Sequence, residues 1–291
     1  MQLDNMAHFL GMETPYEEAL VVVFGAGFDG TTSYRPGTRF ALETMRKESY
    51  GLETYSPRLD LDLEESSIRE IGDLEFALGH TERVLDQIKQ TSQEILQAGK
   101  LPLMVGGEHL VTLPVVEALV EQDSDFYILH FDAHTDLRDD YLGEKLSHAT
   151  VLRRCHDILG DGRIFQFGIR SGTKEEFDFA LKDNHTYMEP FDVKTLPDVL
   201  SKLTGKRVYI TIDLDILDPS IFPGTGTPEA GGLTYKEFEN TLMQVANADI
   251  KIIGADMVEL SPVYDASGVS TVVACKVLRE LALILANSQY I

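Results

Sequence analysis

The 291-residue sequence predicts an α/β fold in which helices cover both faces of a mainly parallel sheet. Two observations favour this class. Short runs that are apolar throughout, as in strands buried on both faces, recur along the chain. Segments with apolar residues at helical spacing separate these runs, which is the pattern of strand–helix–strand units.

The individual elements follow from the same patterns. Strands are expected at residues 20–24, 101–105, 126–131, 164–169, 208–212 and 252–258. Helices are expected at residues 38–47, 81–98, 110–120, 174–181, 235–246 and 269–285, with a further helix capped by Ser147. We expect residues 51–79 to be irregular and residues 1–18 to form an N-terminal arm rather than a core element. The chain contains no repeat or Pro/Ser-rich linker, so residues 1–291 are expected to form a single domain.

The composition restricts the possible functions. The apolar fraction of 43% and the charged fraction of 25% are typical of a soluble globular protein. We expect a cytoplasmic protein, because no apolar run approaches a membrane span, the N-terminus lacks signal-peptide features and the chain has only two cysteines. The net charge of −23 disfavours nucleic acid and anionic membranes as partners and permits a cationic substrate. Most of this charge is expected to be a solvated surface.

Side chains of the kinds that bind metal ions follow three of the predicted strands: His109, Asp132, His134, Asp136, Asp213 and Asp215. The residues after strands 126–131 and 208–212 alternate, so each group shares one face of an extended chain. Because ligands bind at the carboxyl ends of parallel strands, we expect the three groups to converge. Each of the three groups, taken alone, has an ordinary alternative role, such as a helix cap or a loop histidine. The occurrence of such groups at three strand ends favours a metal site.

Six potential ligands exceed what one ion needs, and with bridging carboxylates they suit two divalent ions. The set is rich in oxygen and contains no cysteine, which favours Mn²⁺ over structural zinc. Mg²⁺ ranks second because two histidines rarely bind it. Two such ions would lower the pKa of water, and the resulting hydroxide could attack a planar carbon.

Other residues suggest the substrate. Glu259, which follows strand 252–258, could pair with a guanidinium or amidine group, or alternatively with a nearby Arg. His148 could protonate a leaving amine, and the alternative is a partly exposed loop histidine. Asp139 and Asp140 could attract a cation, or could belong to a solvated charge run.

The loop at residues 25–37 contains the Gly-x-Gly-x-x-Gly pattern of dinucleotide sites. The residues that follow, Thr-Thr-Ser-Tyr-Arg-Pro-Gly, cannot open the helix which that pattern requires. We therefore reject a nucleotide site and expect a functional loop, with a plain connection as the alternative.

Three segments resemble the signatures of the ureohydrolases, the family of arginases and agmatinases: residues 106–109 (Gly-Gly-Glu-His), 131–136 (Phe-Asp-Ala-His-Thr-Asp) and 212–219 (Ile-Asp-Leu-Asp-Ile-Leu-Asp-Pro). Residues 28–37, 223–232 and 258–262 are similar to the bacterial agmatinase branch in particular. The resemblance extends from about residue 20 to about residue 285.

The resemblance implies an arginase-like three-layer α/β/α sandwich with about eight strands and two Mn²⁺ per subunit. It implies that one ion is held by His109, Asp132, Asp136 and Asp213, and the other by Asp132, His134, Asp213 and Asp215. Asp136 would also orient the hydroxide, His148 would move a proton and Glu259 would grip the guanidinium. Family members are usually trimers or hexamers, so a homotrimer or homohexamer is expected.

The reaction expected from the resemblance is hydrolysis of agmatine to putrescine and urea, a step of polyamine biosynthesis. Asp139 and Asp140 stand where arginases have a loop rich in Asn and Ser, and they would suit an ammonium tail. Arg138 would favour an acid if it points inward. The alternatives are a ureohydrolase for guanidinobutyrate, arginine or formiminoglutamate-type substrates, a deacylase with one zinc ion, and a non-catalytic metal-binding relative.

Overall fold

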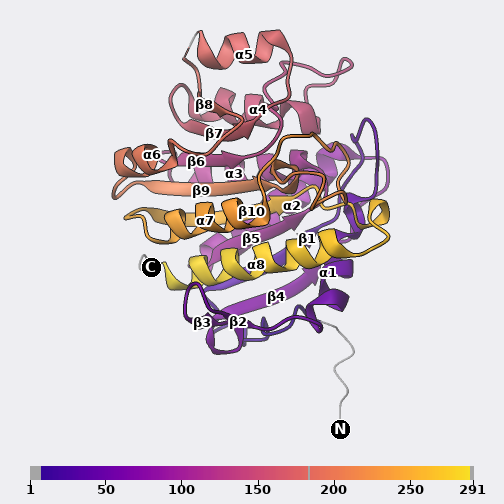
Figure 1. Cartoon of the computed structure of the whole chain (residues 1–291), viewed down its shortest axis with the longest axis vertical. Coiled ribbons are helices and arrows are strands. Elements are labelled where there is room, and N and C mark those ends of the chain that lie inside the picture. Colours follow the sequence, from indigo (N-terminus) through magenta and orange to yellow (C-terminus); the bar gives the residue numbers. More distant parts are fainter. Residues whose placement is uncertain (1–7, 183, 289–291) are drawn as a thin grey trace.

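The computed structural model describes residues 8–182 and 184–288. Its centre is an eight-stranded sheet in which every neighbouring pair of strands is parallel (Figure 1). From edge to edge the strands are β4 (Ile68–Asp73), β1 (Val21–Ala26), β5 (Leu101–Gly106), β10 (Lys251–Val258), β9 (Arg207–Asp213), β6 (Tyr127–Phe131), β7 (Ile164–Ile169) and β8 (Tyr187–Pro190). A short antiparallel ribbon is formed by β2 (Tyr55–Ser56) and β3 (Leu61–Asp62).

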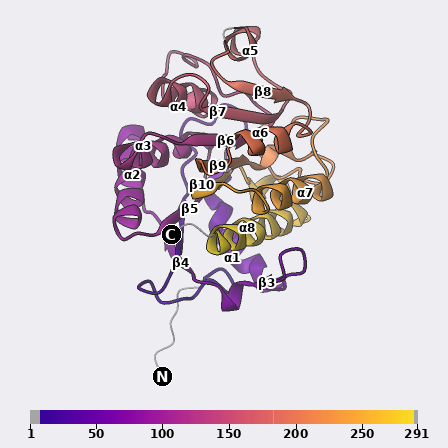
Figure 2. The same ribbon diagram turned by 90° about the vertical axis from the view of Figure 1, so that its left-hand side faces the viewer.

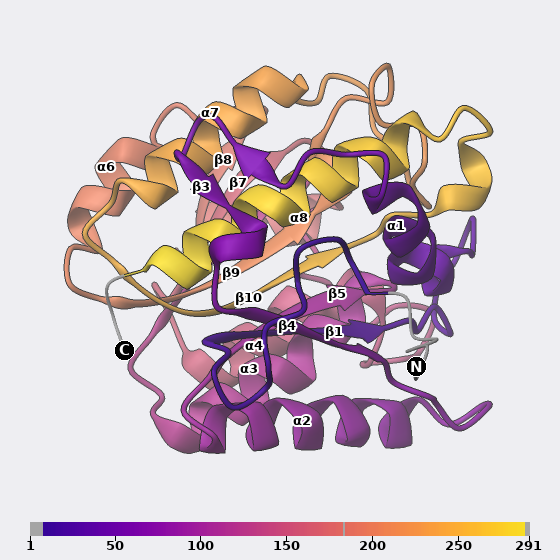
Figure 3. The ribbon, with the colours of Figure 1, turned by 90° about the horizontal axis from the view of Figure 1, so that it is seen from below.

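Helices cover both faces of the sheet, which confirms the three-layer sandwich (Figure 2). One face carries α2 (Thr81–Gln97), α3 (Thr112–Gln122) and α4 (Val151–Leu159). The other carries α1 (Ala41–Ser49), α6 (Leu196–Lys202), α7 (Tyr235–Ala246) and α8 (Val269–Asn287), while α5 (Lys174–Leu181) lies near β8 at one end of the sheet. Figure 3 shows α2 and α8 on opposite sides of the strands.

The sheet separates two hydrophobic cores because side chains of a strand alternate between its faces. In β1, Val21 and Val23 belong to the core beneath α8, while Val22 and Phe24 belong to the core beneath α2 and α3. This double burial explains why the strands are apolar throughout rather than alternating. Within the described residues, no helix is long and apolar enough to cross a membrane.

The six strands predicted from the sequence are confirmed, but the edge strands β4 and β8 were missed. Residues 51–79, expected to be irregular, contain β4 as well as the short ribbon. β4 contains Arg69, Glu70 and Asp73, and these charged residues interrupt the apolar run that marks the other strands. The Glu70 carboxylate is buried and pairs with Arg46 at 2.6 Å. Charged residues are common on edge strands because they discourage pairing with other chains.

The expected N-terminal arm is partly a core segment. Residues 1–7 lie outside the described part of the chain, but Phe9 and Met12 are buried in the core. Backbone hydrogen bonds fix this segment along β4, among them 3.0 Å from the N–H of Glu70 to the carbonyl of Met12. The expectation that residues up to 18 stand apart from the core is therefore corrected from Phe9 onward.

Candidate metal centre

Four adjacent strands at the middle of the sheet, β5, β10, β9 and β6, end next to the predicted site residues. The register places Phe131 of β6 beside Ile212 of β9, and Val258 of β10 beside Asp213. The chain segments that leave these strands therefore start at nearly the same level. This common edge brings together the motifs that the sequence analysis placed at separate strand ends.

His109 lies at one side of the resulting cluster. Its Nδ1 atom is 3.1 Å from Oδ2 of Asp132, 3.2 Å from Oδ2 of Asp136 and 3.4 Å from Oδ2 of Asp213. His109 is 1% exposed, yet this nitrogen makes no well-aligned hydrogen bond within the described chain. Three carboxylate oxygens thus lie within 3.4 Å of one imidazole nitrogen, a grouping that suits the ligands of an ion.

His134 lies at the other side. Its Nδ1 atom is 2.9 Å from Oδ2 of Asp215 and 3.5 Å from Oδ1 of Asp132. Asp132 therefore directs one oxygen toward His109 and the other toward His134. The backbone N–H of His134 donates to Asp132 Oδ1 at 2.5 Å, and the N–H of Asp215 donates to Asp213 Oδ1 at 2.8 Å, so the backbone fixes both carboxylates. All six predicted ligands are brought together.

The charges of the cluster call for a cation. Burial raises the pKa of Asp136 to about 7, and burial with repulsion from Asp215 and Asp132 raises the pKa of Asp213 well above its usual range. Burial opposes a charge on His109, but Asp132, Asp136 and Asp213 outweigh it and raise its pKa. In the part of the chain that the structure describes, the ion pairs of these carboxylates involve histidines, with no Lys or Arg. Divalent ions would supply the missing charge, so the residues fit a metal pair.

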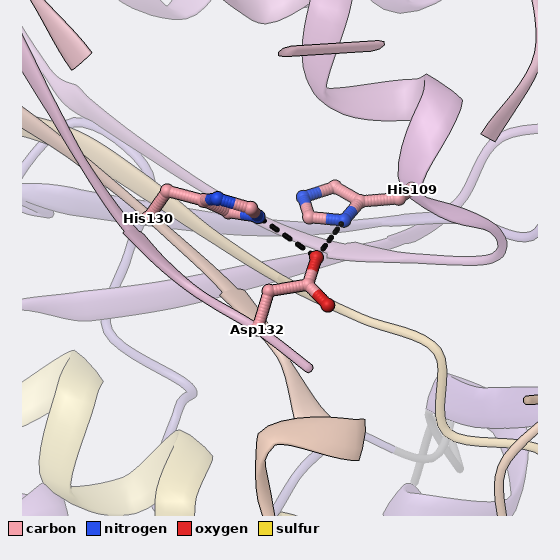
Figure 4. A group of neighbouring side chains, drawn as sticks. All are labelled: His109, His130 and Asp132. Atoms are coloured by element: carbon pink, nitrogen blue, oxygen red, sulfur yellow. Dashed lines mark hydrogen bonds and ion pairs between the residues drawn. The ribbon is translucent and has the colours of Figure 1, made fainter. Parts of the chain in front are cut away.

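Sequence reasoning missed His130, although the alternation that aligns Asp132 with His134 also applies to it. His130 Nε2 lies 2.8 Å from Asp132 Oδ2 (Figure 4). The amide nitrogen of Gln166 donates to the carbonyl of Thr135 at 2.8 Å and faces His130 Nδ1 at 3.0 Å. Because that carbonyl can only accept, the group facing His130 is a donor and the proton of the ring lies on Nε2. His130 therefore donates to Asp132 and orients it rather than binding an ion.

A second buried network orients His109. Tyr209 and Thr211 donate their hydroxyl protons to Asp256 at 2.5 and 2.6 Å. With its proton used in this way, the Thr211 oxygen accepts from His109 Nε2 at 2.9 Å. In the neutral ring, this leaves the lone pair of His109 on Nδ1, which faces Asp132, Asp136 and Asp213. A buried carboxylate thus selects the tautomer that a metal ligand needs.

A cavity of about 250 Å³ opens onto the cluster. Its walls include Asp136, Arg138, His148 and Glu259. Asp136 and Glu259 have φ values of 51° and 67°. This left-handed conformation costs roughly 1–2 kcal/mol for a residue with a side chain, and such strain concentrates at functional sites.

Glu259 and His148 both line this cavity. Glu259 is 6% exposed and accepts the N–H of His109 on Oε1 at 2.9 Å. Burial, and repulsion from Glu108 and Asp215, raise its pKa well above the usual range. His148 Nε2 lies 3.3 Å from the Ser33 hydroxyl, and burial lowers the pKa of His148 to about 4. His148 is therefore a neutral ring near pH 7.

Asp139 and Asp140, predicted to bind substrate, are not brought into the cavity. Asp139 pairs with Arg154 at 2.8 Å, and Asp140 accepts the N–H of Gly143 at 3.1 Å within its own turn. Arg138 does line the cavity, with Nε 3.5 Å from buried Glu176 and its guanidinium 4.6 Å from the Tyr141 ring centre. At this point the cavity wall thus carries the cation of Arg138, paired with Glu176, and not the carboxylates of Asp139 and Asp140 that the sequence predicted.

Glu108 is a further site residue without a predicted role. It is buried beside His109 and accepts hydrogen bonds from the Thr31 N–H at 2.9 Å and the Thr32 hydroxyl at 3.1 Å. These bonds fix the loop of residues 25–37, which carries Ser33 to His148. The adjoining Gly107 is required because a Cβ there would overlap the carbonyl oxygen of Phe28. The loop is therefore part of the site, as expected.

Comparison with known proteins agrees with this geometry. The model of the arginase family matches residues 19–284. The agmatinase of Bacillus anthracis is 47% identical over 276 residues, which cover 94% of this chain and 95% of that protein. A crystal structure described as a candidate agmatinase from Clostridium difficile has a TM-score of 0.92 and 59% identity, covering 94% of this chain and 99% of that one.

An agmatine ureohydrolase structure from Thermoplasma volcanium gives a TM-score of 0.86 at 36% identity, over 97% of this chain and 94% of that one. These matches span the whole described sheet and all the motifs of the candidate centre. The chain therefore belongs to the arginase family and is an agmatinase-like hydrolase of carbon–nitrogen bonds.

Proposed function

We propose that this enzyme hydrolyses agmatine to urea and putrescine, with two Mn²⁺ ions, and so acts in polyamine biosynthesis. The observation that carries the proposal is that buried Glu259 and two carboxylates of the candidate centre, Asp136 and Asp213, line one small cavity. A guanidinium group is flat, cationic and rich in donors, and it pairs with a carboxylate in fork fashion. The similarity to the Bacillus anthracis agmatinase supports the same substrate.

His109, Asp132, Asp136 and Asp213 would hold one ion, and Asp132, His134, Asp213 and Asp215 the other. The bound pair would supply a water that is deprotonated near neutral pH. Mn²⁺ suits a set of four carboxylates and two imidazoles, which is harder than the usual zinc set.

The residues of the chain position the substrate and move its protons. Glu259 keeps Oε1 on the His109 N–H and would offer Oε2 to the guanidinium. This cation would offset the repulsion that raises the pKa of Glu259. As the guanidinium carbon is attacked and its bond to the alkyl nitrogen breaks, that nitrogen needs a proton. Neutral His148 would take a proton from solvent or from the cluster and deliver it to the leaving amine.

Arg138 supports a second candidate substrate, a guanidino acid such as 4-guanidinobutyrate. Its guanidinium lines the cavity and could pair with a carboxylate tail, as Asp139 and Asp140 cannot. Agmatine is preferred because Glu176 already neutralises Arg138 at 3.5 Å. An ammonium tail can therefore pass a wall that carries little net charge.

The test is urea release by the Mn²⁺-loaded protein from agmatine, arginine and 4-guanidinobutyrate, compared as kcat/KM. Agmatine should have the highest value. If 4-guanidinobutyrate is preferred and Arg138→Ala abolishes that preference, the second candidate replaces the first. Urea from none of the three would reject both.

A further inference from the structure

A second group of imidazole and carboxylate side chains lies outside the candidate metal centre, where α4, α5 and β8 meet (Figure 1). His156 is on the last turn of α4, Asp161 is in the turn that follows, and His185 lies two residues before β8. His156 Nε2 is 2.8 Å and His185 Nδ1 is 2.6 Å from the same oxygen, Oδ1 of Asp161. We propose that these three residues form a separate site for one divalent ion that prefers imidazole ligands, with Zn²⁺ as the best fit.

The backbone holds the three residues in place. The N–H of Gly160 donates to the carbonyl of His156 at 2.8 Å, and the N–H of Gly162 donates to the carbonyl of His185 at 3.0 Å. Asp161 therefore lies on a turn that is tied to both histidines. Gly160 and Gly162 have φ values of 80° and 72°, which residues with side chains adopt only under strain. Such a turn keeps the ligands near one another before an ion binds.

Packing also orients the two rings. Phe179 stacks on His185 with ring centres 4.2 Å apart, and it meets His156 edge-on at 5.0 Å. The guanidinium of Arg153 lies 4.1 Å from the centre of the Phe179 ring. His156 Nδ1 is buried and has no hydrogen-bond partner among the described residues, and its nearest carboxylate oxygen, on Asp157, is 3.9 Å away. The ring is thus held by packing, and its Nε2 faces Asp161.

The donor set decides the class of ion. In the structure each contact to Asp161 needs a proton on the facing ring nitrogen. One divalent ion would take the place of both protons, and each neutral ring would then carry its proton on its other nitrogen. Ligand atoms of a tetrahedral ion with bonds near 2.0 Å lie roughly 3.3 Å apart, so the contacts of 2.8 and 2.6 Å must lengthen by about 0.5–0.7 Å. The Asp161 side chain is 66% exposed and can move by this amount, leaving an open face for water.

Two imidazoles and one carboxylate favour Zn²⁺, Cu²⁺ or Ni²⁺. The candidate centre instead has four carboxylates for its two imidazoles. The chain would therefore bind two classes of metal ion at two separate sites. The ion at the second site would join the end of α4 to the segment that leads into the edge strand β8.

The experiment counts Zn²⁺ per chain after metal removal and dialysis against Zn²⁺. In a background in which Asp132→Asn and Asp213→Asn disable the candidate centre, about one equivalent should remain and should disappear with His185→Gln. Co²⁺ should give visible absorption bands that the same substitution removes. The exposed His80→Gln is the matched control and should keep both signals.

The intact Mn²⁺-loaded chain provides a second measurement that does not depend on the folding of the Asn variants. Zn²⁺ at about a hundred times its Kd should raise the Tm of the parent and of His80→Gln by about 5 °C more than that of His185→Gln. Equal Zn²⁺ counts and equal shifts in His185→Gln and the parent would overturn the proposal. Absence of Zn²⁺ binding in all chains would do the same, leaving a hydrogen-bonded cluster only.

Discussion

Replacing Gln166 by Leu should weaken metal binding although Gln166 touches none of the six candidate ligands. Leu is apolar and one atom shorter, so it fills most of the buried space without restoring the lost donor. The substitution removes the group that forces His130 to carry its proton on Nε2. The proton of His130 is then no longer held on Nε2, where it is donated to Asp132. Asp132 is the carboxylate that faces both His109 and His134.

The structure sets the magnitude. Gln166 makes three buried hydrogen bonds, to His130 at 3.0 Å, to the carbonyl of Thr135 at 2.8 Å and from the Thr186 hydroxyl at 3.0 Å. Each group left unpaired costs about 1–3 kcal/mol, so the unfolding free energy should fall by several kcal/mol. Loss of an outer partner of a metal ligand typically weakens affinity by about 10–100-fold, which we expect for Mn²⁺ here.

The assay is Mn²⁺ titration of the metal-free protein, followed by calorimetry or by the signal of free Mn²⁺ in electron paramagnetic resonance. Thr186→Val is the matched control, because it removes only the bond to the Gln166 oxygen and leaves the donor to His130. Its affinity should change by less than about 3-fold, since only one neutral hydrogen bond is lost. A folded Gln166→Leu chain that binds Mn²⁺ as tightly as the parent would refute the tautomer argument.

Three further predictions concern single side chains. Arg138→Ala should raise the kcat/KM for agmatine relative to 4-guanidinobutyrate by about 10-fold, because one positive charge leaves the cavity wall; an unchanged ratio would mean that Arg138 does not face the tail. His148→Asn should lower kcat by about 10²–10⁴ without changing the number of bound Mn²⁺, and steady-state kinetics with metal analysis would test this. Burial raises the pKa of Glu108 from 4.5 to about 7, so the folded metal-free chain holds a proton that the unfolded chain releases. Stability should therefore fall as pH rises between these values, and Glu108→Gln should reduce that fall in thermal melts; parallel curves would contradict it.

The candidate centre could be predicted because it follows from two local rules. The alternation of an extended chain predicts that Asp132, His134 and Asp136 share one side, and parallel strands end at one edge of the sheet. Neither rule needs knowledge of distant contacts. The same alternation could have identified His130, whose position within an apolar strand resembles that of a core residue.

The remaining features depend on contacts between segments that are far apart in the sequence. Gln166 acts through β7, which pairs with β6 so that Gln166 aligns with His130. Arg154, on α4, draws Asp139 away from the cavity. The charged residues of β4 hide its strand pattern in the sequence. Glu70 can nevertheless be buried in this strand because Arg46, on α1, pairs with it. No local pattern in the sequence states these pairings.

The strand order has a consequence for how the molecule assembles. β10 is the last strand to be synthesised, yet it occupies the middle of the sheet between β5 and β9. His109 follows a strand on one side of β10, while Asp132 and Asp213 follow strands on the other. The two blocks cannot share a continuous sheet until β10 has inserted, and such long-range closure is slow in folding. The nascent chain therefore carries its acidic residues unassembled until almost all strands have been made, and activity should appear only with that final insertion.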